Sequence, residues 1–160
     1  MRWLGRNFWK KSMLKPKVLL DTNVVVSGLV FLRGNEHRIL KLAENRVIIL
    51  VLPGFVIEET RVVLTRRFTG HEVLLNAFLS RVEYTVPSWE EVEPLISVYR
   101  EFVRDKKDAP ILASVVLVKP DFVVTGDRVL RDDLGRCREV EPTKICSPRQ
   151  FLEMVSRKPL

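Results

Sequence analysis

The chain has 160 residues, which is the size of one domain with a substantial core. Its hydrophobic fraction is 46% and its longest apolar runs are far too short to span a bilayer, so we expect a cytoplasmic protein without integral membrane association. Cys137 and Cys146 match neither a zinc-ligand spacing nor a disulfide framework, and reduced thiols are expected. His37 and His71 lie far apart without partner residues, which disfavours a zinc site or a catalytic triad.

The net charge of +7 is concentrated at the start of the chain. Of the 27 lysines and arginines, six precede residue 18, where there is no acid, and the 21 that remain face 20 acids. We therefore divide the chain into a basic, aromatic N-terminal extension at residues 1–16 and a single domain at residues 17–160. As a helix the extension suits a membrane surface, nucleic acid or a partner. The alternative that Met13 is the true start stays open.

The first half of the chain alternates strand and helix patterns. An apolar strand at 18–20 is followed by helical turns at 24–30, and Gly34-Asn35 marks a break. The elements predicted next are an amphipathic helix at 36–45, an apolar strand at 47–52, helices at 55–67 and 71–80, and a short strand at 83–86.

The second half continues the alternation. Apolar residues at helical spacing predict a helix at 88–104, and another helix carries Ile111 and Leu112. Further patterns predict a strand at 121–125, an edge strand at 139–141 and a terminal helix at 148–157. Short apolar strands separated by helices indicate an α/β three-layer sandwich, with a central, mainly parallel sheet flanked by helices.

Two aspartates follow strands of this predicted sheet. Asp21 comes directly after Leu20, and Asp127 closes the strand that ends in Thr125-Gly126. Ligands of open α/β sheets bind at the carboxyl ends of the strands, so both carboxylates are expected at one edge. Carboxylates that a fold gathers repel one another, which favours a bound cation. Alternatively, Asp21 only caps the following helix and Asp127 only stabilises a turn.

Two further acids lie on predicted helices. The neighbours of Glu59 at three and four residues are all apolar, so we expect Glu59 to face the interior and Glu58 to face solvent. Asp108 lies over the apolar face that contains Ile111, although it could instead cap its helix. Asp105 is expected in solvent. Asp132 and Asp133 remain open as additional or substitute ligands.

With these residues in view, the chain resembles the PIN-domain nucleases, especially small single-domain prokaryotic members. The resemblance runs from about residue 17 to 134 through Leu20-Asp21-Thr22-Asn23, the helix from Glu59, Asp105-Lys-Lys-Asp108 and Val123-Val-Thr-Gly-Asp127. It implies an acidic pocket that binds Mg²⁺ or Mn²⁺ and hydrolysis of phosphodiesters, most often in RNA. Carried over by position, the catalytic and metal-binding acids are Asp21, Glu59, Asp108 and Asp127, with Thr22, Asn23 and Thr125 in support.

The leading hypothesis is a metal-dependent endoribonuclease acting on single-stranded RNA. Arg61, Arg66, Lys106 and Lys107 are candidates for steering the phosphates, although a solvated helix face is the commoner use of such charges. The resemblance also suggests the toxin of a toxin–antitoxin pair, an antitoxin partner and a homodimer. One alternative is a noncatalytic nucleic-acid-binding or scaffold module. A small-molecule phosphohydrolase with an aspartate nucleophile is disfavoured, because Asn23 occupies the third position of the Asp-x-Asp start.

Overall fold

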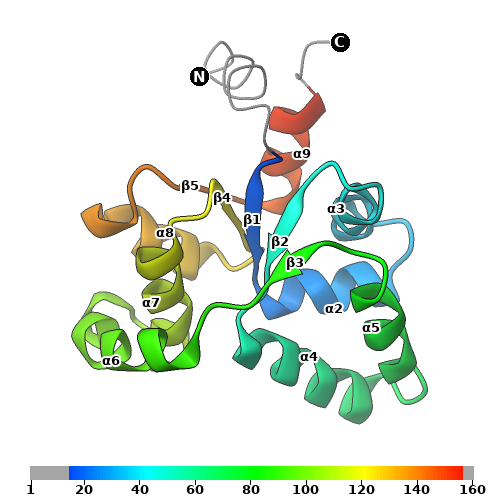
Figure 1. Ribbon diagram of the computed structural model, residues 1–160, viewed down its shortest axis with the longest axis horizontal. Coiled ribbons are helices and arrows are strands. Elements are labelled where there is room, and N and C mark those ends of the chain that lie inside the picture. The colour runs from blue at the N-terminus through cyan, green and yellow to red at the C-terminus, as the bar shows by residue number, and fades with distance from the viewer. Residues whose placement is uncertain (1–14, 157–160) are drawn as a thin grey trace.

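The computed structural model describes residues 15–156, which form five strands and eight α-helices (Figure 1). The strands are β1 (Lys17–Leu20), β2 (Ile49–Val51), β3 (Tyr84–Thr85), β4 (Phe122–Val124) and β5 (Lys144–Cys146). The helices are α2 (Thr22–Val30), α3 (Asn35–Glu44), α4 (Gly54–Arg67), α5 (Glu72–Leu79), α6 (Trp89–Tyr99), α7 (Ala109–Val118), α8 (Arg128–Arg136) and α9 (Pro148–Ser156). Within this part of the chain, no helix has the length and apolar character needed to cross a membrane. Except for Lys15 and Pro16, the predicted extension at residues 1–16 lies outside the described residues.

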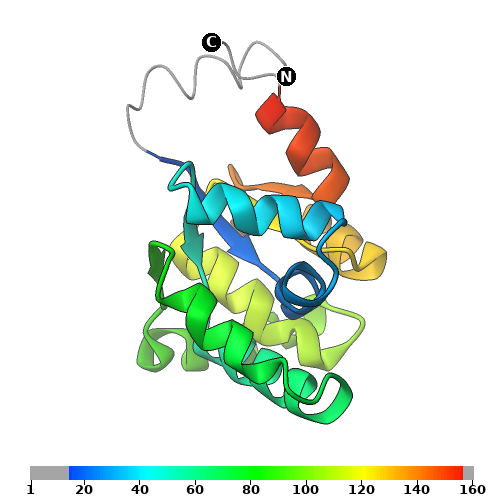
Figure 2. The same ribbon diagram turned by 90° about the vertical axis from the view of Figure 1, so that its right-hand side faces the viewer.

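The sheet is parallel throughout, with strand order β3-β2-β1-β4-β5 and β1 at its centre. Leu19 pairs with Val51 on one side and with Val123 on the other, and all three residues are fully buried. Helices α6 and α7 lie on one side of the strands, while α3 and α9 lie on the other (Figure 1 and, turned by 90°, Figure 2). Apolar strands covered on both faces are the arrangement that the sequence predicts, so the α/β sandwich is confirmed.

Gly28, His37 and His71 all take part in packing between elements of the fold. A Cβ added to Gly28 would lie 2.6 Å from Leu40 Cδ1, so only glycine lets α2 and α3 approach this closely. The Gly28 carbonyl oxygen lies 2.8 Å from Nδ1 of His37. The His71 ring packs edge-on against Phe68 with ring centroids 6.2 Å apart. His37 therefore joins α3 to α2, and His71 packs at the end of α4 just before α5.

Three predicted elements differ from the structure. The edge strand predicted at 139–141 is wrong, because Arg138–Val140 forms a 3₁₀ turn (η3) and the edge strand is β5. Only Val140 in that stretch is apolar and buried, which gives no strand face to the core. The helix predicted at 88–104 ends at Tyr99 and continues as a second 3₁₀ turn, η1 (Arg100–Phe102). Helix α8 was absent from the prediction.

Candidate active site

Asp21 and Asp127 meet at the carboxyl edge of the sheet because they follow the adjacent parallel strands β1 and β4. Leu20 pairs with Val124, and the backbone N–H of Asp21 then donates to the Val124 carbonyl at 3.2 Å. Asp21 is the N-cap of α2 and Asp127 is the N-cap of α8. The capping alternative is thus true of Asp21, and Asp127, for which the alternative was a turn, caps α8. Capping coexists with their shared position, since both helices begin at the same edge.

Thr125 links these two aspartates through its buried hydroxyl group. Its Oγ1 donates to Asp21 Oδ2 at 2.8 Å and accepts the backbone N–H of Asp127 at 3.0 Å. The other oxygen of Asp21, Oδ1, accepts the backbone N–H of Thr22 at 2.8 Å. Asn23 is exposed and makes no hydrogen bond to Asp21 among residues 15–156. Asp21 is therefore held by Thr22 and Thr125 and not by Asn23.

Asp108 lies at the N-terminus of α7, in the last position of a third 3₁₀ turn, η2 (Lys106–Asp108), and its side chain caps nothing. Its Oδ2 is buried and has no hydrogen-bond partner among the described residues. Burial raises the pKa of this carboxyl to about 6, with further contributions from the negative charges of Asp105, Asp127, Asp21 and Asp133. A buried carboxylate oxygen without a partner is costly, so this atom has the strongest need for a cation.

Glu59 takes part in the same electrostatic cluster, although the sequence argument about its direction is wrong. Both Glu58 and Glu59 are exposed, because the inward face of α4 runs through Val56, Thr60 and Leu64. Burial raises the pKa of Asp21, and the charges of Glu59 and Asp127 raise it further, against the lowering effect of its hydrogen bonds. Glu59 therefore lies near enough to Asp21 to repel it while open to solvent.

The remaining aspartates of α8 are engaged elsewhere. Asp133 is only 3% exposed and accepts both the backbone N–H of Arg104 at 2.9 Å and its Nε at 2.8 Å. Asp132 lies 3.3 Å from Nη2 of the same arginine. Both carboxylates are thus engaged in ion pairs with Arg104, while the charge of Asp133 still acts on Asp108. This Arg104–Asp133 clamp fastens α8 to the segment that leads into Asp108. Sequence reasoning missed it, since nothing local joins two such distant residues.

The four predicted phosphate-steering cations fall into two pairs. Arg61 donates to Asn76 Oδ1 at 3.1 Å and lies 3.9 Å from a Glu58 oxygen, and Lys106 Nζ donates to the Arg100 carbonyl at 2.9 Å. Arg66 and Lys107 are exposed, and neither side chain forms an ion pair within residues 15–156. Among the four, these last two would have no ion pair within the described residues to give up on meeting a phosphate.

The four acids form a repelling cluster, not a finished coordination shell. Across residues 15–156, no group of three or more His, Cys, Asp and Glu side chains has the arrangement of a metal site. The donors nevertheless suit Mg²⁺ or Mn²⁺: they are carboxylate oxygens without His or Cys, and the orphaned Asp108 Oδ2 stands among them. Mg²⁺ usually keeps several of its waters, so a partial set of protein oxygens is compatible with binding.

A parallel α/β sheet with carboxylates gathered at the ends of its central strands defines a class of proteins that bind ligands or cations at that edge. A family model described as PIN domain matches residues 17–129, and the chain belongs to the PIN-domain family. PIN domains are generally nucleases. The structure is similar to a crystal structure of FitAcB from Neisseria gonorrhoeae, with a TM-score of 0.53 and 17% sequence identity over 82% of this chain and 98% of that one. This likeness shows a shared fold. The comparison with curated proteins gave no match.

Proposed function

We propose that this protein is a divalent-metal-dependent endoribonuclease that hydrolyses RNA phosphodiester bonds. Membership of a family whose members are generally nucleases supports the class of reaction. The observation that carries the metal dependence is Asp108 Oδ2, which is buried without a partner and feels the charges of Asp21 and Asp127. A fold that keeps this atom unsatisfied in the protein leaves it available to a cation.

Asp21, Asp108 and Asp127 would hold Mg²⁺ or Mn²⁺. When bound, the cation supplies Lewis acidity toward the phosphate oxygens and lowers the pKa of a coordinated water. Thr125 keeps Asp21 Oδ2 in one orientation through its 2.8 Å hydrogen bond. Glu59, which is open to solvent, would bind a second cation or orient the attacking water by accepting its proton in a hydrogen bond.

Arg66 and Lys107 would attract the strand by its phosphates, an effect that weakens as salt concentration rises. Lys106 and Arg61 would take part only by exchanging their present contacts with Arg100 and Asn76 for a phosphate. The substrate in this proposal is single-stranded RNA. We propose the cytoplasm as the location of this activity.

The proposal extends to the toxin of a toxin–antitoxin pair, with an antitoxin protein as partner and a homodimer as the assembly. It rests on the resemblance to small prokaryotic PIN proteins of the VapC type. Expression of the chain should arrest growth, and Asp108→Asn should abolish the arrest. Coexpression with the product of an adjacent small reading frame should relieve it. Arrest that persists in Asp108→Asn would contradict the toxin assignment.

The decisive test is cleavage of end-labelled single-stranded and hairpin RNA with Mg²⁺, Mn²⁺ or EDTA. We expect internal cuts that need metal and that fall by about 10²-fold or more in Asp108→Asn and Asp21→Asn, since each loses a charged ligand. Asp132→Asn is the matched control, because its exposed carboxylate pairs with Arg104 outside the cluster. Cleavage that persists in EDTA or in Asp108→Asn would sink the metal-dependent mechanism. RNA binding without cleavage would instead favour the noncatalytic module.

A further inference from the structure

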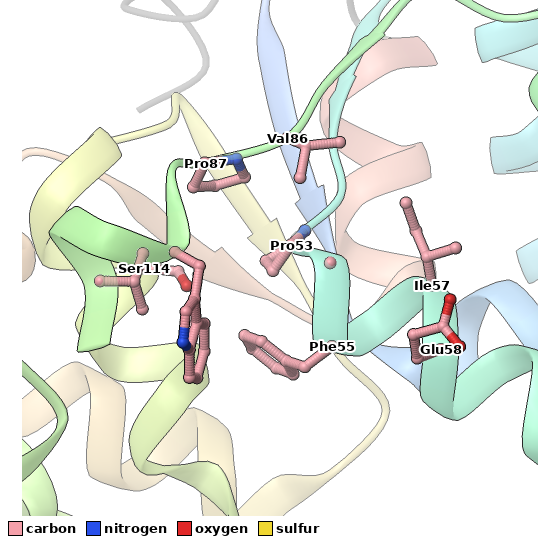
Figure 3. Close-up of a pocket in the computed structure, with 10 residues that line it drawn as sticks. Pro53, Phe55, Ile57, Glu58, Val86, Pro87 and Ser114 are labelled. Carbon is pink, nitrogen blue, oxygen red and sulfur yellow. The ribbon is translucent and has the colours of Figure 1, made fainter.

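A hollow of about 580 Å³ lies over the start of α4 (Figure 3). In the close-up, Phe55 points to one side of the first turn of α4, Ile57 and Glu58 point to the other, and Val86 and Pro87 lie above. Trp89 and Val92 of α6 and Ser114 of α7 complete the wall together with Pro53 and Gly54. Of these ten lining residues only Glu58 is charged. The volume is within the ~300–1,000 Å³ range of small-ligand sites.

This hollow adjoins the acid cluster at the same edge of the sheet. Because Leu19 pairs with Val51, Pro53 stands beyond β2 where Asp21 stands beyond β1. Phe55 precedes Glu59 by one turn on the same face of α4. Helix α7, which supplies Ser114, begins directly after Asp108. Three segments that line the hollow are thus each linked to one acid. The residues after β2 lie beside Asp21, α4 carries Glu59, and α7 follows Asp108.

Two aromatic side chains, Phe55 and Trp89, line the hollow, and Trp89 and Val86 are each 50% exposed. Half-exposed apolar groups around a concave surface gain free energy when a flat apolar ligand covers them. We propose that this hollow binds one unpaired nucleobase of the RNA strand whose phosphate lies at the acids. The inference rests on the proposed ribonuclease function and adds a subsite to it.

The chemistry of the lining selects the base over other parts of the strand. The hollow has no cation among its lining residues, and Glu58 repels a phosphate. A base is uncharged and planar, and every base offers a face for stacking on an aromatic ring. A base within a duplex already stacks between its neighbours, so only an unpaired one is free to enter. The hollow therefore gives a physical basis for a preference for single strands, with little selection among the four bases.

The experiment uses a parent protein in which Trp3→Phe and Trp9→Phe leave Trp89 as the sole tryptophan. A short single-stranded RNA is titrated in EDTA, which separates binding from cleavage. We expect the RNA to quench Trp89 fluorescence and Phe55→Ala to raise Kd about tenfold, which is the usual loss of one stacked base. Phe55→Tyr should keep the parent Kd. Val62→Ala is the matched control, since Val62 is an exposed apolar residue of α4 outside the hollow.

A second measurement leaves the hollow unchanged and alters the RNA. An abasic nucleotide is placed at each position of the strand in turn. At one position it should weaken binding to the parent about tenfold and have little further effect on Phe55→Ala, because both changes remove the same contact. If the parent binds no RNA in EDTA and cleaves none with Mg²⁺ or Mn²⁺, the proposed function fails. If it cleaves RNA with metal but shows no binding in EDTA, the base subsite alone is overturned. Suppose that the parent binds RNA, but that Phe55→Ala binds it as tightly as the parent and all abasic strands bind as tightly as the intact strand. The base subsite alone is then overturned. Duplex RNA that binds the parent as tightly as single-stranded RNA would overturn it too.

Discussion

Asp127 and Asp108 occupy the same position relative to a helix and have opposite surroundings. Asp127 Oδ1 accepts the backbone N–H groups of Val129 at 2.9 Å and Leu130 at 3.2 Å, whereas Asp108 accepts none from α7. The sequence contains part of the reason. In α8 the second helical residue is Val129, which donates an N–H, but in α7 it is Pro110, which has none.

The difference teaches that a helix N-terminus does not by itself satisfy a carboxylate. The backbone of Asp127 is extended, with φ −79° and ψ 110°, as a capping residue requires, while Asp108 is already helical at φ −86° and ψ −9°. One aspartate stabilises its helix and the other retains an unsatisfied oxygen. Three predictions test this contrast in the protein without metal.

The largest expected effect on stability concerns the hydroxyl group of Thr125, which is hydrogen-bonded to Asp21 and to the backbone of Asp127. Thr125→Val removes the donor to Asp21 and leaves the backbone N–H of Asp127 without its acceptor. We expect the free energy of unfolding to fall by about 1–3 kcal/mol, since buried polar groups lose their partners. Urea unfolding measures this loss. Thr125→Ser keeps the hydroxyl and should recover most of it, and equal losses in both variants would refute the role of the hydrogen bonds.

The second prediction concerns the pH dependence of stability that arises from Asp108. The folded pKa of Asp108 is about 6 against the ordinary value of 3.8, so between these pH values the folded protein holds a proton that the unfolded chain has released. The contribution of Asp108 to the free energy of unfolding must therefore fall as pH rises through this window. The fall should be about 1–2 kcal/mol, less than the full shift implies because solvent screens a partly exposed group.

Asp108→Asn should remove that part of the pH dependence, so the variant gains stability over the wild type at pH 7.5 and not at pH 4. Thermal unfolding in EDTA at both pH values measures the difference. Addition of Mn²⁺ at pH 7.5 should stabilise the wild type and leave Asp108→Asn nearly unchanged, because only the wild type keeps the full ligand set. A gain that is equal at both pH values would show that the titration of Asp108 is not its source.

The smallest expected effect is the difference in stability between a substitution at Asp127 and one at Asp108. Asp127→Ala should cost about 1 kcal/mol through the lost cap of α8. Asp108→Ala should cost nothing or stabilise the metal-free protein, since it removes repulsion and no cap. Chemical denaturation of the two variants at pH 7.5 gives the comparison. Equal destabilisation would mean that Asp108 supports its helix after all.

Sequence reasoning succeeded where the signal is local. The apolar run that ends at Leu20 predicts a buried strand, and the aspartate after it must then lie at the edge of the sheet. It failed for Glu59, because apolar neighbours on a helix do not show that their face is buried. Val62, three residues after Glu59, is itself 44% exposed. Helix α8 was missed although the cap at Asp127 and the buried Leu130 and Leu134, four residues apart, would have indicated it.

The state of Asp108 lies beyond such reasoning. Pro110 in the sequence removes one donor, but the burial of Oδ2 and the proximity of Asp127 depend on how α7 and α8 pack in three dimensions. The same holds for Phe55 and Trp89, which come from different helices and share a hollow only in the folded chain. A pattern along the chain identifies which residues reach the edge of the sheet and not which of them remain unsatisfied there.

The Arg104–Asp133 clamp has a mechanical consequence. Asp127 is the N-cap of α8, and Asp133, further along the same helix, binds Arg104 in the segment that precedes Asp108. A tilt of α8 would therefore move Asp127 at its N-cap and, through Arg104, pull on the segment that leads into Asp108.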